Sequence, residues 1–294
     1  MRSLRSATNT RRTAALGLAI LAWSGCTRVV ELVVEEGPKR LVVQARLQRP
    51  KDGADGRQVF YLSTTDAVQS SRQLPPAVGA RVRVTDEQGR PFDFEELPDL
   101  PGQYFGTVLP VIGRGYTLTI DYQGERYQAF HRMLPVAPID SLYFVFLEEG
   151  VTVGEAGLRA AIDYTDPPGE ENYYLWELRV NGLRQGQVDP GSRFRMISED
   201  RFYDGGTVIG YQPYDDEIVL PGNVVEVRQI ALSKDAYRYY YVLLEQMTGG
   251  GGPFSTPPAS VRGNVANLTN PSNPALGYFY AAELAIRTRV VPRE

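Results

Sequence analysis

Apolar and polar residues alternate along much of the chain, which is the pattern of strands with one buried and one exposed face. The alternation is strict at 80–85 and 116–122, and turn residues follow both segments. Further strands are predicted at 40–48, 58–64 and 127–132. Several short strands at this spacing, with no helix between them, predict a β-sandwich over residues 40–134.

A second domain is predicted at 139–294. Pro135-Val-Ala-Pro138 separates it from the first domain as a stiff linker. Its predicted strands include 139–146, 158–164, 173–180 and 223–232. Asn181-Gly182 directly follows one of them and is typical of a tight hairpin turn.

One segment, 233–247, has helical instead of strand periodicity. Ala236, Tyr240, Leu243, Leu244 and Met247 form one apolar stripe, which Tyr237 and Tyr241 widen. Ser233 is a good N-cap, and the run Gly249 to Gly252 ends the helix. The predicted fold class is therefore all-β, with two β-sandwich-like domains and one docked α-helix near the C-terminus. Leu244 is predicted to be buried and Arg238 to face solvent.

The N-terminus has the features of a secretory signal. Arg2, Arg5, Arg11 and Arg12 precede an apolar run at 14–23, which is too short to span a bilayer. Ser24-Gly25 then precede Cys26, the only cysteine, so the pattern resembles a bacterial lipoprotein signal, although Trp23 stands where leucine is usual. Residues 1–25 are predicted to be a signal peptide, Cys26 the lipidated residue and 26–39 a tether. An ordinary secretory signal with a coincidental cysteine is the alternative.

Charge and cysteine content narrow the classes of function. Removing the four arginines of the signal leaves 27 basic residues against 35 acidic ones, a formal net charge of −8. Such an acidic chain argues against binding to nucleic acid or broadly to anionic membranes. With Cys26 acylated, neither a disulfide nor a cysteine nucleophile is available.

Candidate catalytic chemistry is sparse. His131 is the only histidine, which excludes multi-histidine metal sites, and we interpret it as an interdomain or core-edge residue. The acidic segment Asp163–Asn172 is interpreted as a solvated turn, with a calcium site as the alternative. No phosphate-binding loop or dinucleotide fingerprint occurs in the sequence. No catalytic residue, metal or cofactor is therefore predicted.

Four segments together resemble a known family. They are GARVRVTDEQG at 79–89 with PGQY at 101–104, LPVAPIDSLY at 134–143, DPPGEENYY at 166–174, and a stretch from Ala236 through Pro253-Phe254 and Gly263-Asn264-Val265 to Gly277-Tyr-Phe279. In order and spacing they are similar to the Bacteroidota lipoproteins catalogued as domain of unknown function 4249. The resemblance implies an immunoglobulin-like first domain and a β-rich second domain. It also implies a gene that often lies beside a TonB-dependent outer-membrane transporter.

The function predicted from these features is that of a lipid-anchored outer-membrane accessory protein. It would assist a TonB-dependent transporter in substrate capture or gating, with no enzymatic activity and with the small-molecule or glycan ligand unknown. The candidate partner-binding residues are Tyr239, which is predicted to be exposed, Phe254, Gly249 and Gly252. An envelope hydrolase using carboxylates and a structural or adhesive surface lipoprotein are the alternatives. Whether the protein faces the cell surface or the periplasm is left open.

Overall fold

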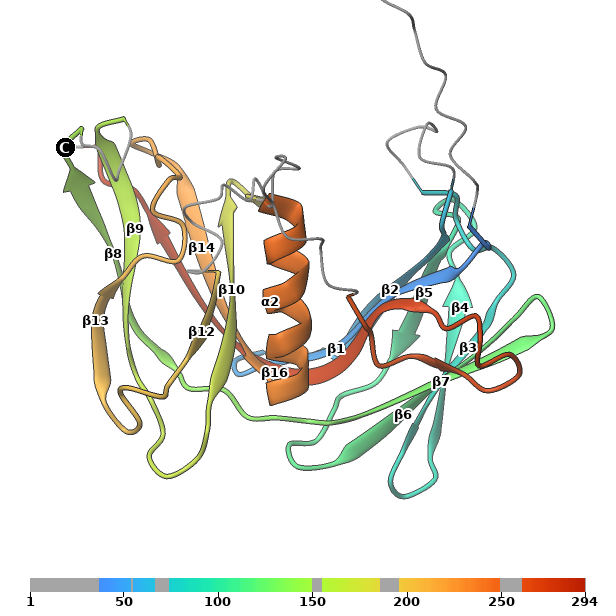
Figure 1. Ribbon diagram of the computed structural model, residues 1–294. Helices are drawn as coiled ribbons and strands as arrows, with labels where there is room; N and C mark the ends of the chain where they lie inside the picture. The colour runs from blue at the N-terminus through green and yellow to red at the C-terminus, as the bar shows by residue number, and fades with distance from the viewer. Residues whose placement is uncertain are drawn as a thin grey trace, which may run out of the picture. The chain divides into compact units, whose positions relative to one another are not determined.

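The computed structural model describes residues 37–53, 55–66, 74–149, 155–185, 196–248 and 261–293. The strands of the first half are β1 (Leu41–Pro50), β2 (Arg57–Thr64), β3 (Arg81–Asp86), β4 (Pro91–Glu96), β5 (Gln103–Thr107), β6 (Gly115–Tyr122) and β7 (Glu125–Arg132). Those of the second half are β8 (Ile139–Leu147), β9 (Gly157–Thr165), β10 (Tyr173–Val180), β11 (Leu183–Arg184), β12 (Ile197–Glu199), β13 (Thr207–Tyr211), β14 (Val224–Leu232), β15 (Ala266–Asn267) and β16 (Leu276–Val290). Helix α2 (Lys234–Thr248) completes the described elements, so the predicted all-β class with a helix near the C-terminus is confirmed (Figure 1).

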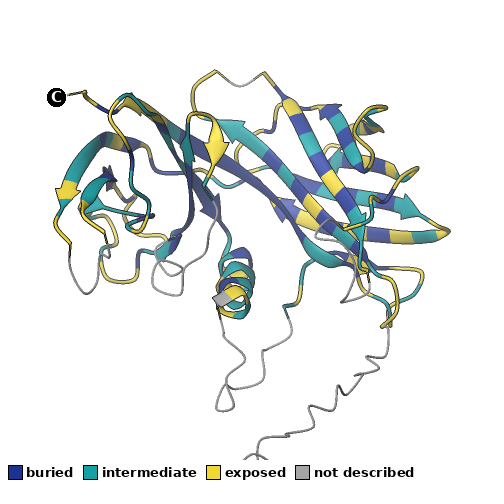
Figure 2. Cartoon of the chain, turned by 90° about the horizontal axis from the view of Figure 1, so that it is seen from above, coloured by how far each residue is buried: buried dark blue, intermediate teal, exposed yellow. Residues whose placement is uncertain are grey.

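The first half is a sandwich because alternate side chains of its strands meet in one core. Its strands follow the order β1-β2-β5-β4-β3-β6-β7 within one long sheet that folds over on itself. Buried residues alternate with more exposed ones along β3 and β7. Figure 2 shows such bands of buried and exposed residues on several strands. In the core, the ring of Phe60 stacks on Phe94 with centroids 4.2 Å apart and meets Phe279 edge-on at 6.4 Å.

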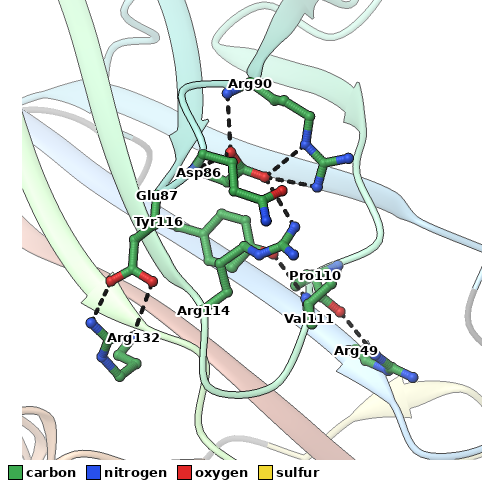
Figure 3. A network of polar contacts seen from close by, with 10 residues as sticks. Arg49, Asp86, Glu87, Arg90, Pro110, Val111, Arg114, Tyr116 and Arg132 are labelled. Atoms are coloured by element: carbon green, nitrogen blue, oxygen red, sulfur yellow. Dashed lines mark hydrogen bonds and ion pairs between the residues drawn. The ribbon is translucent and has the colours of Figure 1, made fainter.

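A polar network closes the turn between β3 and β4 (Figure 3). The side chain of Asp86 is fully buried and accepts hydrogen bonds from the backbone N–H groups of Gln88 and Arg90, each at 3.0 Å. Guanidinium groups also reach it, with Nη2 of Arg90 at 2.9 Å and Nη1 of Arg114 at 3.1 Å. Because every contact to the carboxylate is a donor, the network fixes the turn and joins it to the start of β6.

The second half is built around an aromatic core. A separate sheet, in the order β13-β9-β8, packs on the part of the long sheet formed by β10, β14 and β16. Trp176 is fully buried, and its ring lies 5.2 Å from both Tyr164 and Tyr211, measured between centroids. Its indole N–H donates to Ser198 Oγ at 3.0 Å, so the one polar atom of the ring is satisfied.

Strand β16 joins the two halves. It pairs in parallel with β1 and antiparallel with β14, and both halves belong to one compact unit that begins at Pro38. Alternate side chains serve the two cores: Phe279 and Ala281 lie in the first, and Tyr278 and Tyr280 in the second. Strand β16, which belongs to the predicted second domain 139–294, thus also supplies side chains to the core of the predicted first domain 40–134.

Helix α2 begins as predicted and packs on β10, β12 and β14. The hydroxyl of Ser233 caps it by accepting the N–H of Ala236 at 3.2 Å. Ala236 and Leu244 are buried, but Met247 is 59% exposed, so including it in the buried stripe was wrong. Among the described residues the apolar core of the second half reaches along the helix only as far as Leu244. None of the described helices is long and apolar enough to cross a membrane.

The orientation of α2 predicts unequal costs for two substitutions on it. Leu244→Ala removes a side chain that is 5% exposed and should lower the free energy of unfolding by about 2–5 kcal/mol. Arg238→Ala should change it much less, because that side chain is 67% exposed and its ion pair with Asp235 lies at the surface. Denaturant melts of both variants test this. Equal losses would contradict the packing of the helix.

Candidate binding site

The predicted site residues are only partly within the described structure. Cys26, Gly249, Gly252 and Phe254 lie outside the described residues. Tyr239 is half-buried, because its ring packs on Tyr278 with centroids 4.9 Å apart. Tyr241 is instead the exposed tyrosine of the helix, at 37%. The accessible aromatic surface of α2 is therefore on the side that faces β10 and β12.

A groove of about 390 Å³ lies on that side, and we call it the helix groove. Its aromatic wall consists of Tyr173 from β10 and Tyr237 and Tyr241 from α2. The rings of Tyr173 and Tyr237 lie 5.0 Å apart, and those of Tyr237 and Tyr241 lie 6.5 Å apart. Consecutive tilted rings at this spacing form a continuous surface that is apolar on its faces and polar at its hydroxyls.

Charged groups of both signs surround the aromatic wall of the helix groove. Lys234 Nζ lies 2.7 Å from Glu171, which also accepts the hydroxyl of Tyr173 at 2.9 Å. The hydrogen bond from Lys234, followed by that from Tyr173, lowers the pKa of the Glu171 carboxyl. Arg201 and Arg238 lie farther along the rim. An aromatic wall with a mixed polar rim is the composition of surfaces that bind peptides or other proteins.

Three carboxylates meet behind the 166–172 loop. Asp166, Asp200 and Asp204 place ligand oxygens within 4.8 Å of one another, and the first two side chains are buried. Asp166 accepts a hydrogen bond from Tyr174 Oη at 2.6 Å. Asp200 accepts one from Asn172 N at 2.8 Å, and Asp204 one from Gly169 N at 2.7 Å. Burial, and then the charges of Asp200 and Asp204, raise the pKa of the Asp166 carboxyl.

Only Asp166 of this cluster belongs to the acidic segment singled out in the sequence. Asp163, at the start of that segment, accepts from Ser141, Tyr143 and Gly210 N instead, and Glu171 lies at the helix groove. Asp200 and Asp204 are missed by sequence reasoning because more than thirty residues separate them from Asp166. A local spacing pattern does not reveal a cluster that forms only through the pairing of β10 with β12.

His131 connects the first half to the N-terminus of α2. It is 6% exposed, its Nδ1 accepts the N–H of Ala281 at 3.2 Å, and its Nε2 lies 3.1 Å from Ser233 Oγ. Because Nδ1 accepts, the neutral ring carries its proton on Nε2 and donates it to the capping serine. The interpretation as a core-edge histidine agrees with these contacts, which occupy both ring nitrogens.

The stability of the protein should fall as the pH drops below neutrality because of His131. Burial lowers the pKa of His131 below the 6.5 of the free side chain. The unfolded chain therefore binds a proton that the folded chain does not, so stability is full above pH 6.5 and is lost as the pH falls towards the folded pKa. The slope can reach about 1.4 kcal/mol per pH unit. It is measured by denaturant melts between about pH 5 and 8.

A His131→Gln variant provides the control, since no other histidine titrates in this range. It should be less stable at pH 8 but should show a flatter dependence on pH. An unchanged slope in the variant would contradict the assignment to this ring.

Comparison with known proteins identifies one family. The family model described as Domain of unknown function (DUF4249) matches residues 27–285. Among solved structures, the crystal structure of a DUF4785 family protein from Legionella pneumophila is similar at 9% identity, with a TM-score of 0.22. That match covers 64% of this chain and 52% of the other, so it spans about half the length of the Legionella protein. No curated protein matches the chain.

Proposed function

Since the chain belongs to the DUF4249 family, we propose that it is a lipid-anchored outer-membrane protein that assists a transporter and catalyses no reaction itself. The observation that carries the proposal is the position of the family match relative to the signal-like N-terminus. The match begins at residue 27, directly after the cysteine that a lipoprotein signal would place at the new N-terminus. A body that starts at this point fits a protein tethered by Cys26.

The partner we propose is a TonB-dependent transporter, which the resemblance to Bacteroidota lipoproteins implies. The helix groove is the surface that would meet it. Its tyrosines give contact area with few rotatable bonds, so little side-chain entropy is lost on binding. Strands β10 and β12 hold one side of the groove rigid, and α2 holds the other. Such a preformed surface suits an accessory protein that assists substrate capture or gating.

Two features favour a binding protein over an enzyme. The histidine that could act as a general base has both ring nitrogens in structural hydrogen bonds. The three clustered aspartates accept hydrogen bonds from their own chain, which uses part of their capacity to hold a substrate or a water molecule. The histidine and the three aspartates therefore have structural roles in the fold.

Anchoring is tested by Cys26→Ser. Lipidation supplies the binding energy for the membrane, so this variant should move from the membrane fraction to the soluble fraction of the cell envelope. Fractionation with a high-salt wash, followed by immunoblotting, measures the shift. If the serine variant still sediments with outer membranes after the wash, a lipid on Cys26 is not the main anchor.

Partnership is tested by purification from native membranes in mild detergent. The intact chain should bring down a TonB-dependent transporter, and Tyr241→Ala should reduce its recovery about tenfold. Phe130→Ala removes an aromatic residue that is 54% exposed on β7, outside the helix groove, and serves as the matched control. Both variants should melt like the parent chain. Equal recovery with both variants would overturn the helix groove as the partner surface, and turnover of a glycan or ester by the purified chain would favour a hydrolase.

A further inference from the structure

A second groove, of about 620 Å³, lies on one face of the long sheet. There, alternate side chains of β1 and β2 meet those of β16, β14 and β10, which are neighbouring strands in the order of the sheet. It does not share residues with the helix groove. Five arginines line it, and we call it the arginine groove: Arg46, Arg57, Arg179, Arg184 and Arg228.

One buried carboxylate fixes two of these arginines. The side chain of Glu177 is 4% exposed, and its Oε1 lies 2.8 Å from Nη1 of Arg46 and 3.2 Å from Nη2 of Arg184. Arg46 comes from β1 and Arg184 from β11, so the two guanidinium groups converge on this carboxylate from distant parts of the chain. They are positioned before any ligand arrives, which lowers the entropy that binding would cost.

A second carboxylate, that of Glu226, is shared between two arginines where β10 pairs with β14. Glu226 on β14 lies opposite Arg179 on β10, and its Oε1 is 2.6 Å from Nε of Arg228 but 3.8 Å from Nε of Arg179. The buried Nε of Arg179 has no hydrogen-bond partner among the described residues. A guanidinium group with five donors and so few protein acceptors can still donate to a ligand.

The charges of the arginine groove do not balance. Asp55 neutralises Arg57, at 2.6 Å. Glu177 carries one negative charge against its two arginine partners, and Glu226 likewise carries one against its two. Two positive charges remain on a face of a chain whose formal net charge is −4. Like charges gathered in a groove are unfavourable unless an anion joins them, because the surrounding protein screens them less than water does.

From this arrangement we infer that the arginine groove binds a small organic anion carrying at least two carboxylate or phosphate groups. Guanidinium groups match both oxyanions through paired, parallel hydrogen bonds. The volume is within the range of small-molecule sites. Leu284, Ile286 and the ring of Tyr61 line the same groove and offer apolar contact for the carbon skeleton of the ligand. The excess of two charges corresponds to a dianion.

This inference goes beyond the proposed function and does not depend on it, because the binding is measured on the isolated chain. The full chain is purified in mild detergent and titrated by calorimetry with citrate and, separately, with inorganic pyrophosphate. These probes distinguish a carboxylate ligand from a phosphate ligand. Uncharged glycerol, added at equal concentration, controls for binding that does not need charge.

At least one anion should bind, and raising the salt concentration should weaken the binding. Arg179→Gln and Arg228→Gln should each raise the dissociation constant about tenfold or more. Arg83→Gln is the control: this arginine also pairs with a carboxylate, with its Nε 2.6 Å from Asp93, but it lies on β3 and outside the groove. It should leave the dissociation constant unchanged.

Melting curves without a probe establish that the variants are folded, and a rise in melting temperature with the probe gives a second readout. Tighter binding of citrate would assign a polycarboxylate, and tighter binding of pyrophosphate a phosphorylated ligand. Failure of both anions to bind at about 10 mM would overturn the inference, since that concentration detects even millimolar affinity. Binding that Arg179→Gln and Arg228→Gln leave intact would also overturn it.

Discussion

The Gly277→Ala variant is expected to lose about 3 kcal/mol or more of its free energy of unfolding, or to fail to fold. Gly277 has a φ of +90°, where side chains other than glycine are strained. A Cβ added there would also lie 2.0 Å from the carbonyl oxygen of Val43, its partner on β1. Because that oxygen belongs to the backbone of a central strand, it cannot move aside without breaking the pairing that joins the two halves.

Gly263 lies equally close to the backbone of Gly277. A Cβ at this position would lie 1.7 Å from the carbonyl oxygen of Gly277, so three backbone segments are stacked where side chains have no room. Gly263→Ala should therefore be about as costly as Gly277→Ala. These distances show that both glycines serve the close approach of the backbone.

Denaturant melts of both variants, with Gly89→Ala as the matched control, measure the effect. Gly89 has a similar φ of +78° but nothing within 4 Å of an added Cβ. Its alanine variant should cost only the backbone strain, about 1–2 kcal/mol. If Gly277→Ala melts at the same denaturant concentration as Gly89→Ala, the close approach to Val43 is not an energetic constraint.

Local features of the fold were predictable because local rules govern them. The strict alternation at 80–85 corresponds to β3, and Asn181-Gly182 forms the expected turn, with φ angles of 51° and 80°. Ser233 caps α2 in the predicted way. In each case the signal and the structure that it specifies lie within a few residues of one another.

Long-range pairing was not predictable. The parallel ladder of β1 with β16 joins Val42 to Leu276, which are more than two hundred residues apart. Together with the ladders of β16 with β14 and of β14 with β10, it brings Arg46 to Glu177, so the arginine groove has no signature in any single segment. In the helix, tyrosines occur around much of the circumference, so the sequence did not indicate which side packs on the core. The prediction that Tyr239 is its most exposed tyrosine was accordingly wrong, since Tyr241 is the exposed one.

The second large effect is expected at Asp86, the centre of the polar network in Figure 3. Asp86→Ala should lower the free energy of unfolding at pH 7 by about 3 kcal/mol or more. The substitution leaves two backbone N–H groups and the guanidinium of Arg114, whose side chain is 19% exposed, without the acceptor that they share. Unpaired donors and a partly buried charge each cost more than the hydrogen bonds contributed.

The cost of Asp86→Ala should depend on pH in a defined direction. Burial alone would raise the pKa of Asp86, but the hydrogen bonds from Arg90 and Gln88 outweigh burial and lower it below the usual 3.8. A lowered folded pKa gives stability that is present above the unfolded value and is lost as the pH falls through the folded one. The stability curves of the parent and the variant should therefore approach each other in acid.

Asp93→Ala is the control for Asp86→Ala, because it removes an ordinary surface ion pair. Asp93 bonds Arg83 at 2.6 Å, but both side chains are about half exposed, so its loss should cost much less than that of Asp86. Urea melts of the three proteins from neutral pH down to about pH 3 measure both the cost and its pH dependence. A gap between the parent and Asp86→Ala that stays constant down to the lowest pH would mean that the carboxylate charge of Asp86 does not hold the turn.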